Sequence, residues 1–186
     1  MQRLLSKRKK CLKKDYFNLM KLSSWYVCIA IGLGLFFLDL VTKQLVIHYL
    51  PSPHELFIGK GQDIVIFQHF LGISCSITHA VNTGAAWGYF GDFPHLLLVL
   101  RIFLISCLAC YLIFWPVPGK FRLPLILILS GAIGNVLDFF LYGHVIDMLH
   151  FVFWGYDYPV FNVADSLIFI GTFLILFMTI REKETC

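Results

Sequence analysis

The sequence predicts an all-α integral membrane protein, with four transmembrane helices and a small β-containing subdomain in an extracytoplasmic loop. Of its 186 residues, 59% are hydrophobic and only 14% are charged. A chain of this size cannot enclose so much apolar surface in one soluble core, which makes a lipid bilayer the better solvent. Three apolar stretches, at 24–47, 94–142 and 162–180, are long enough to span it.

The stretch at 94–142 is long enough for two spans of about 20 residues each. Pro116, Pro118, Gly119 and Lys120 interrupt it, and prolines with a glycine are typical of a loop between helices. We therefore predict four spans. The chain divides into a basic tail at 1–23, a four-span domain at 24–180 with outer loops at 48–93 and 143–161, and a second tail at 181–186.

Basic residues are unevenly distributed along the chain. Eight of the 15 lysines and arginines lie within the first 21 positions, which predicts a cytoplasmic N-terminus by the positive-inside rule. Four spans return the C-terminus to the same side. The two outer loops contain one basic residue between them, Lys60, as expected outside the cell. A basic tail beside a span is explained by this topology and by anionic lipid headgroups, which argues against nucleic acid binding.

The longer outer loop carries signals of β-structure. Residues 64–70 and 73–79 are rich in β-branched and aromatic side chains, and Leu71 and Gly72 lie between them. Two such runs separated by two residues are typical of a β-hairpin. The sequence therefore predicts a small sheet on the outer side.

Polar side chains from the spans are predicted to gather at one depth. At 1.5 Å per residue, Asp39 and Lys43 lie about 20 to 27 Å along the first span, near its outer end, as i,i+4 neighbours. Asn135 and Asp138 come shortly before the outer end of the third span, and Asp165 opens the fourth. Ionisable residues in spans mark functional sites by default. Their depth indicates a site at the outer boundary, whereas transporters bind substrates near the midplane.

Asp147 follows the third span and Asp165 opens the fourth, so a short loop can bring the two carboxylates together. Two adjacent carboxylates cannot both ionise easily and therefore share a proton. One can then deprotonate water while the other protonates a substrate carbonyl, as in aspartyl proteases. Spacing alone leaves open that both are solvated, or that Asp165 caps its helix. His144, Asp147 and His150 form a weak metal-binding pattern without a firm third ligand.

Five motifs occur in a fixed order: DLVTK at 39–43, NTGAAWG at 82–88, GNVLD at 134–138, GHVID at 143–147 and FNVAD at 161–165. Together they resemble the type II, or lipoprotein, signal peptidases of bacteria. The resemblance implies a multi-pass enzyme of the bacterial cytoplasmic (inner) membrane, with its active site near the outer face. It would remove the signal peptide from diacylglyceryl-modified prolipoproteins, cutting on the N-terminal side of the lipidated cysteine.

The resemblance also implies roles for individual residues. Asp147 and Asp165 correspond to the catalytic dyad. The residues implied to bind substrate or support the dyad are Asp39, Lys43, Asn82, Gly84, Asn135, Asp138, Asn162 and Ala164. No metal or organic cofactor is implied. The expected partners are lipid-modified prolipoproteins, membrane lipids and globomycin-type inhibitors.

Two positions depart from the family pattern. Phe139 stands where the family usually has an arginine directly after the GNxxD aspartate, and Met148 stands where it usually has a phenylalanine. Without that arginine, Asp138 needs another charge partner. Arg101 lies about 10 Å below the outer end of the second span. It can either pair with Asp138 or snorkel to the lipid headgroups.

The residues also allow two other classes of function. A small transporter or proton-conducting protein could use the paired carboxylates, and a non-catalytic scaffold could use the same four spans. The position of the polar groups at the membrane edge argues against the transporter. The complete motif set argues against the scaffold.

Overall fold

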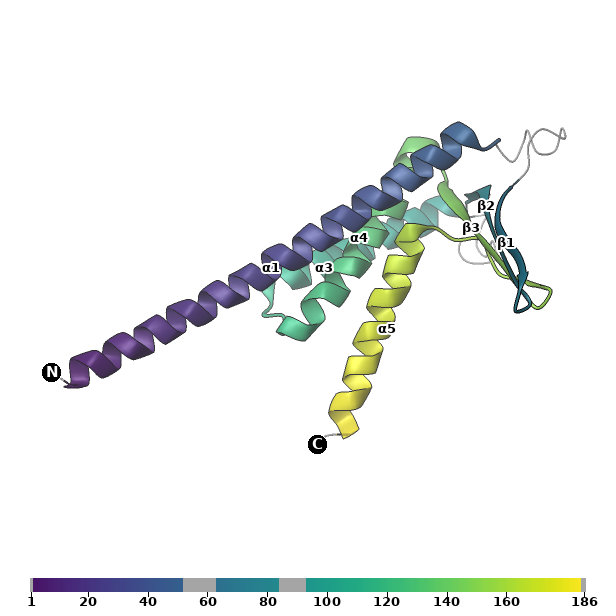
Figure 1. Cartoon of the computed structure of the whole chain (residues 1–186). Helices are drawn as coiled ribbons and strands as arrows, with labels where there is room; N and C mark the ends of the chain where they lie inside the picture. Colours follow the sequence, from purple (N-terminus) through teal and green to yellow (C-terminus); the bar gives the residue numbers. More distant parts are fainter. Residues whose placement is uncertain (1, 52–62, 84–92, 185–186) are drawn as a thin grey trace.

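The computed structural model describes residues 2–51, 63–83 and 93–184 of the chain. Four long helices dominate these residues (Figure 1). They are α1 (Gln2–Tyr49), α3 (Pro94–Phe114), α4 (Gly119–Tyr142) and α5 (Val163–Glu184). Each holds a segment long and apolar enough to cross a membrane, at Ser24–Tyr49, Pro94–Phe114, Gly119–Tyr142 and Val163–Arg181. The four predicted spans are therefore confirmed, including the break between α3 and α4.

Helix α4 is the centre of the bundle, because α1, α3 and α5 all pack against it. Glycines let the α4 and α5 backbones approach closely. A Cβ atom at Gly131 would lie 2.3 Å from the carbonyl oxygen of Ala164, and one at Gly171 would lie 2.6 Å from that of Pro124. Helix packing in membranes relies on such small residues. Figure 1 shows α1 and α5 converging near the sheet and separating toward the chain termini.

A four-stranded antiparallel sheet lies at the end of the bundle where α5 begins (Figure 1). Its strands are β1 (Ile64–Phe70), β2 (Ile73–Asn82), β3 (Val145–Phe153) and β4 (Tyr156–Asp157), paired in that order. The predicted hairpin is confirmed as β1 and β2. The sheet is larger than predicted, because the segment between α4 and α5 contributes β3 and β4.

Two tight turns close the β1–β2 and β3–β4 hairpins. Leu71 and Gly72 have φ values of 52° and 82°, and Trp154 and Gly155 have 49° and 85°. Two consecutive residues with positive φ are the signature of a type I′ turn, which matches the right-handed twist of paired strands. The two turns also meet, because the Trp154 N–H donates to the Gly72 carbonyl at 2.8 Å.

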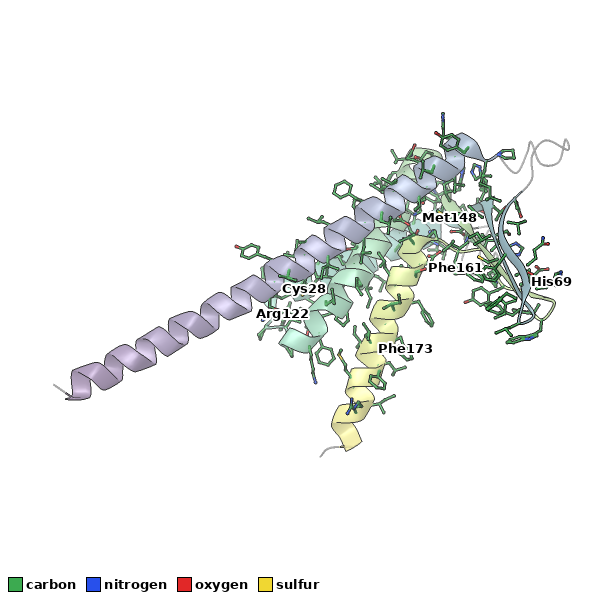
Figure 2. The ribbon with its side chains drawn as sticks, in the orientation of Figure 1. Cys28, His69, Arg122, Met148, Phe161 and Phe173 are labelled. Atoms are coloured by element: carbon green, nitrogen blue, oxygen red, sulfur yellow. The ribbon has the colours of Figure 1, made fainter. Side chains whose placement is uncertain are left out.

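Strand β3 carries the chain from the C-terminal end of α4 toward the start of α5. Residues 145–148 at its beginning are all buried. Its register with β2 sets Asp147 opposite Ala80 and Val145 opposite Asn82. Met148 (labelled in Figure 2) and Ile146 pack against Val46 and Leu50 at the C-terminal end of α1. The strand therefore fixes the position of Asp147 between the sheet and the helices.

Candidate active site

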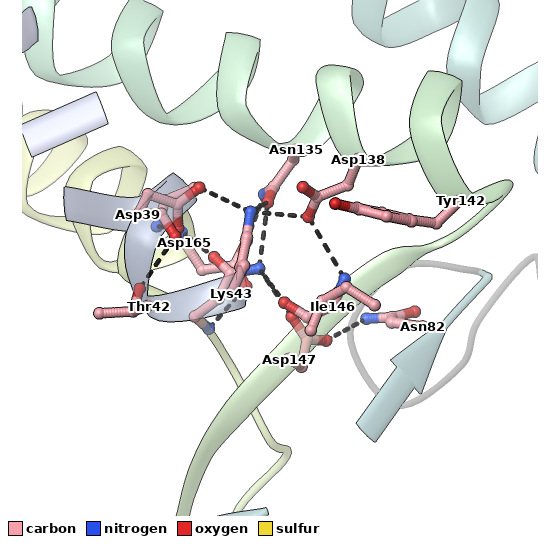
Figure 3. A network of polar contacts seen from close by, with 12 residues as sticks. Asp39, Thr42, Lys43, Asn82, Asn135, Asp138, Tyr142, Ile146, Asp147 and Asp165 are labelled. Carbon is pink, nitrogen blue, oxygen red and sulfur yellow. Dashed lines mark hydrogen bonds and ion pairs between the residues drawn. The ribbon is translucent and has the colours of Figure 1, made fainter. Parts of the chain in front are cut away.

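The buried Lys43 ammonium links α1 to α4 through contacts with polar side chains of both helices (Figure 3). Its Nζ atom lies 2.6 Å from Asp39 Oδ2 and 2.7 Å from Asp138 Oδ2. It also donates to Asn135 Oδ1 at 3.2 Å. The ammonium is thus in contact with two carboxylates and one amide oxygen. Lys43, Asp39 and Asp138 are each 1% exposed, and this cation is therefore held by protein groups in place of water.

Lys43 is thus a charge partner of Asp138. The alternative in which Arg101 pairs with Asp138 does not appear among the ion pairs of the described residues. Asp138 Oδ2 also accepts a hydrogen bond from the Ile146 N–H at 3.3 Å. Arg101 instead lines a cleft between α3, α4 and α5 that reaches Asn135. The missing family arginine leaves no uncompensated carboxylate at Asp138.

The start of α5 is a capping box built from Asn162 and Asp165. Asn162 Oδ1 accepts from the Asp165 N–H at 2.7 Å, and Asp165 Oδ2 accepts from the Asn162 N–H at 3.3 Å. This is the reciprocal pattern of N-cap and N3 residues, with Asn and Asp in the two roles. The Ala164 N–H points at Asp39 Oδ1, 2.8 Å away. The N-cap residue of α5 is therefore Asn162, and Asp165, one of the residues considered for that role, stands at N3 and returns the bond to the cap. Asp39 ties this helix start to α1.

Asn162 also bridges Asp147 and Asp165. Its Nδ2 atom donates to Asp147 Oδ1 at 2.7 Å, while its backbone N–H serves Asp165. Asn162 is fully buried, so its orientation is fixed by these bonds. The two carboxylates from β3 and α5 consequently share Asn162 as a hydrogen-bond donor.

Amide side chains complete the hydrogen bonding of both carboxylates. Asn82, at the end of β2, donates to Asp147 Oδ2 at 2.9 Å. Asn135 of α4 donates to Asp165 Oδ1 at 2.7 Å and accepts from Lys43 and Asn162. Every carboxylate oxygen of the pair thus accepts a hydrogen bond, which fixes both side chains before any substrate is bound.

Asp147 is 2% exposed, and its burial is the main cause that raises its pKa to about 7. The negative charge of Asp165 raises it further. The hydrogen bonds from Asn82 and Asn162 and the Lys43 charge act in the opposite direction. A carboxyl group with a pKa near neutrality can hold or release a proton under working conditions, as acid–base catalysis requires.

Most of the predicted site residues are brought together by these contacts. Ala164 contributes through its backbone N–H and a fully buried side chain. Gly84 lies outside the described residues. His150 contacts Asp157 of β4 at 3.2 Å, and no three His, Cys, Asp or Glu side chains of the described residues are grouped as metal ligands would be.

One feature escaped the sequence reasoning: an aromatic cleft beside Asp165. Its volume is about 550 Å³, and it lies between β3, the segment before α5, and the first turns of α5. The residues that line it are Phe151, Phe153, Tyr158, Phe161, Asp165, Ser166, Phe169 and Ile170. The rings stack on one another, for example Phe151 on Phe161 with centroids 5.8 Å apart. Aromatic residues on alternate positions of β3 were the available signal, but it required recognising β3 as a strand.

Comparison with known proteins shows the family of the chain. The model of the signal peptidase (SPase) II family matches residues 31–181. The chain belongs to this family. The lipoprotein signal peptidase of Clostridium tetani is 35% identical over 156 residues, which cover 83% of this chain and 92% of the relative. That of Chlamydia muridarum is 38% identical over 151 residues, which cover 79% and 87%.

Solved structures show the same fold. A bacterial membrane enzyme determined by the in meso method at 2.3 Å resolution superposes with a TM-score of 0.73 and 27% sequence identity. The superposition covers 86% of this chain and 90% of that structure. Signal peptidase II is a peptidase family, so the chain is an enzyme of the membrane, and the transporter and scaffold alternatives are set aside.

Phe139 and Met148, the two departures from the signal peptidase II pattern, each pack against neighbouring side chains. Phe139 packs edge-on against His95 of α3, with ring centroids 6.0 Å apart. Met148 is 3% exposed and belongs to the apolar cluster at the end of α1. Neither substitution disturbs the contacts around Lys43 or between the two aspartates.

Proposed function

We propose that this enzyme is an aspartyl endopeptidase that removes signal peptides from diacylglyceryl-modified prolipoproteins. The observation that carries the mechanism is the Asn162 bridge, which holds Asp147 and Asp165 together with one donor on each carboxylate. The substrate class follows from the family and from its relatives, which are named lipoprotein signal peptidases. The cut lies N-terminal to the lipidated cysteine.

The resting dyad carries one proton between its two carboxyl groups. This proton is on Asp147, whose pKa is about 7. Asp165, ionised and hydrogen-bonded to Asn135, removes a proton from a water molecule. The resulting hydroxide attacks the scissile carbonyl carbon while Asp147 delivers its proton to the carbonyl oxygen. The product of this step is a neutral tetrahedral diol, because the negative charge of the dyad has moved from Asp165 to Asp147 and none develops on the substrate.

Collapse of the diol completes the reaction. Asp147, now ionised, takes back a proton from one hydroxyl, and Asp165 gives its proton to the leaving nitrogen. The C–N bond breaks, which releases the signal peptide as a carboxylic acid and the lipoprotein with a free cysteine amine. The protons of the dyad are restored, and the buried Lys43 keeps the surrounding carboxylates compensated throughout.

The aromatic cleft supports binding of the peptide next to this dyad. It reaches Asp165 and is otherwise almost entirely apolar, like the hydrophobic segment of a signal peptide. Incubation of the purified protein with a diacylglyceryl-modified prolipoprotein, followed by mass spectrometry, is the direct test. Release of an intact signal peptide and a lipoprotein beginning with the modified cysteine is expected. A cut at another bond, or none, would refute the proposal.

The pH profile of the reaction is a further prediction. Above about pH 7, Asp147 loses the proton that the dyad must share, so kcat should fall as the pH rises through that value. Initial rates between pH 5 and 9 in one detergent, with saturating substrate, measure this. A rate that stays constant from pH 6 to 9 would contradict the assignment of the proton to Asp147.

We also propose that both termini are cytoplasmic and that the dyad lies near the outer face. The distribution of basic residues supports this orientation. A reporter fused to either terminus should report the cytoplasm, and one inserted in the 48–93 loop should report the exterior. An external C-terminus would place the dyad on the wrong side of the membrane for secreted prolipoproteins.

A further inference from the structure

The cleft that Arg101 lines is separate from the aromatic cleft and has no role in the mechanism above. It has a volume of about 240 Å³ and is formed where α3 and α5 flank α4. The residues that line it are Arg101, Leu104, Ile105, Leu108, Ile128, Ala132, Asn135 and Ile168. We call it the α4 cleft.

The α4 cleft is polar at one end and apolar along the rest. Arg101 lies seven residues from the start of α3, and Asn135 lies seven residues before the end of α4. At 1.5 Å per residue both are about 10 Å below the outer ends of their helices, and therefore at one level. Leu108 and Ile128, seven residues further along each helix, lie about 10 Å deeper. The polar pair is thus nearest the outer surface, and the apolar part extends toward the membrane centre.

We propose that the α4 cleft binds the diacylglyceryl group of the substrate, with Arg101 donating hydrogen bonds to its ester carbonyls. The proposal rests on the proposed function, since it assigns the lipid part of that substrate. Asn135 connects the cleft to the dyad, because it donates to Asp165 at 2.7 Å. The lipid on the cysteine and the peptide before it would then occupy different clefts, which meet at Asp165 and Asn135.

The chemistry of the cleft favours a diacylglyceryl group over a peptide helix. The backbone carbonyls of a helix are bonded to its own N–H groups, so a helix offers little to a guanidinium. Ester carbonyls have no internal donors and are free to accept. A guanidinium has five N–H donors, so Arg101 can bind an ester beside any contact it makes within the protein. In a bound diacylglyceryl group the esters lie nearer the surface and the acyl chains lie deeper. Arg101 and the leucine and isoleucine side chains of the cleft follow the same order.

The test compares two substrates that differ only in the lipid linkage. One carries the natural diester, and the other carries the same chains as a diether, which lacks the carbonyl acceptors. The wild-type enzyme should have a KM about tenfold lower for the diester, the effect of one charge-assisted hydrogen bond. Arg101→Gln should reduce this preference to less than twofold, and Arg101→Lys should restore part of it. Arg181→Gln, at the far end of α5, is the matched control and should keep the full preference.

Photolabelling tests the location without relying on turnover. A substrate with a diazirine in one acyl chain is bound to Asp147→Asn enzyme and irradiated, and labelled residues are found by mass spectrometry. Labels on Ile105, Leu108 or Ile128 are expected. Labels there from a diazirine in the signal peptide, or from free phospholipid that substrate fails to displace, would overturn the proposal.

The two proposals fail in different ways. If wild-type enzyme cleaves the diester but Arg101→Gln slows diester and diether equally, the lipid assignment is wrong and the peptidase function stands. If wild-type enzyme cleaves neither substrate, the proposed function itself is wrong.

Discussion

Asp147→Asn and Asp165→Asn are each expected to lower kcat by about a thousandfold or more, which is in the upper range for loss of a general acid or base. An asparagine at either position keeps the shape of the side chain but cannot exchange a proton with water or with the substrate. Both carboxylates serve in both halves of the reaction, so neither loss can be compensated by the other. Single-turnover assays with a lipidated prolipoprotein measure the effect.

Asp157→Asn is the matched control, because Asp157 is 79% exposed and contacts only the His150 ring among the described ion pairs. It should retain near wild-type activity. Substantial turnover by purified Asp147→Asn or Asp165→Asn enzyme would remove that residue from the catalytic role.

The same substitution at Asp147 should leave the fold intact. The pKa of Asp147 is higher in the folded protein than the ordinary value of 3.8, so the folded state binds this proton more tightly than the unfolded state. Ionisation of Asp147 therefore lowers stability as the pH rises from about 4 through about 7. Asparagine removes that loss, and Asp147→Asn enzyme should unfold at the same temperature as wild type or higher at pH 8.

The parts of this fold that depend on local patterns could be predicted. Each span is a continuous apolar run, and the β1–β2 hairpin is two β-rich runs around Leu71 and Gly72. Strand β3 was missed because residues 145–148 are buried on both faces, so they lack the alternation that marks a half-exposed strand. Its partner β2 lies more than 60 residues earlier in the chain, a distance over which local patterns carry no information.

The sequence could not decide the charge partner of Asp138, for a geometric reason. Counting residues along a helix gives the depth of a side chain but not the neighbour that it faces. Asp138 points at Lys43 on α1, whereas Arg101 lies in the α4 cleft. The Asp39–Lys43 spacing could be read as an i,i+4 pair on one helix, but the third partner comes from α4 and appears only once the helices are packed.

Lys43→Met is expected to destabilise the enzyme by about 3 to 5 kcal/mol, the usual cost of breaking a buried ion pair from one side. Methionine is close to lysine in length and fills the same space, so the loss reports the charge. Asp39 and Asp138 would both remain 1% exposed and lose their cation. Asp39 also accepts a hydrogen bond from the Ala164 N–H at the start of α5. Loss of its cation would therefore also affect α5, the helix that contains Asp165.

Lys120→Met is the control for removing a lysine from this protein, because Lys120 is exposed at the start of α4. It should change stability by less than about 1 kcal/mol, as for exposed charges in general. Unfolding of both variants is followed by denaturant titration in one detergent, with helical circular dichroism as the readout.

A double-mutant cycle separates the ion pair from the other contacts of Lys43. In Lys43→Met/Asp138→Asn enzyme, one of the two stranded carboxylates is replaced by a neutral amide, so the double variant should be more stable than the sum of the single losses implies. The coupling should exceed about 1 kcal/mol, because contacting residues in one buried network are strongly non-additive. Lys43→Met/Asp157→Asn enzyme should show additive losses, since Asp157 lies in the exposed part of the sheet. Additive losses for the Lys43 and Asp138 variants as well would mean that the 2.7 Å contact between these residues does not stabilise the fold, and that the loss in Lys43→Met reports the contacts of Lys43 with Asp39 and Asn135 instead.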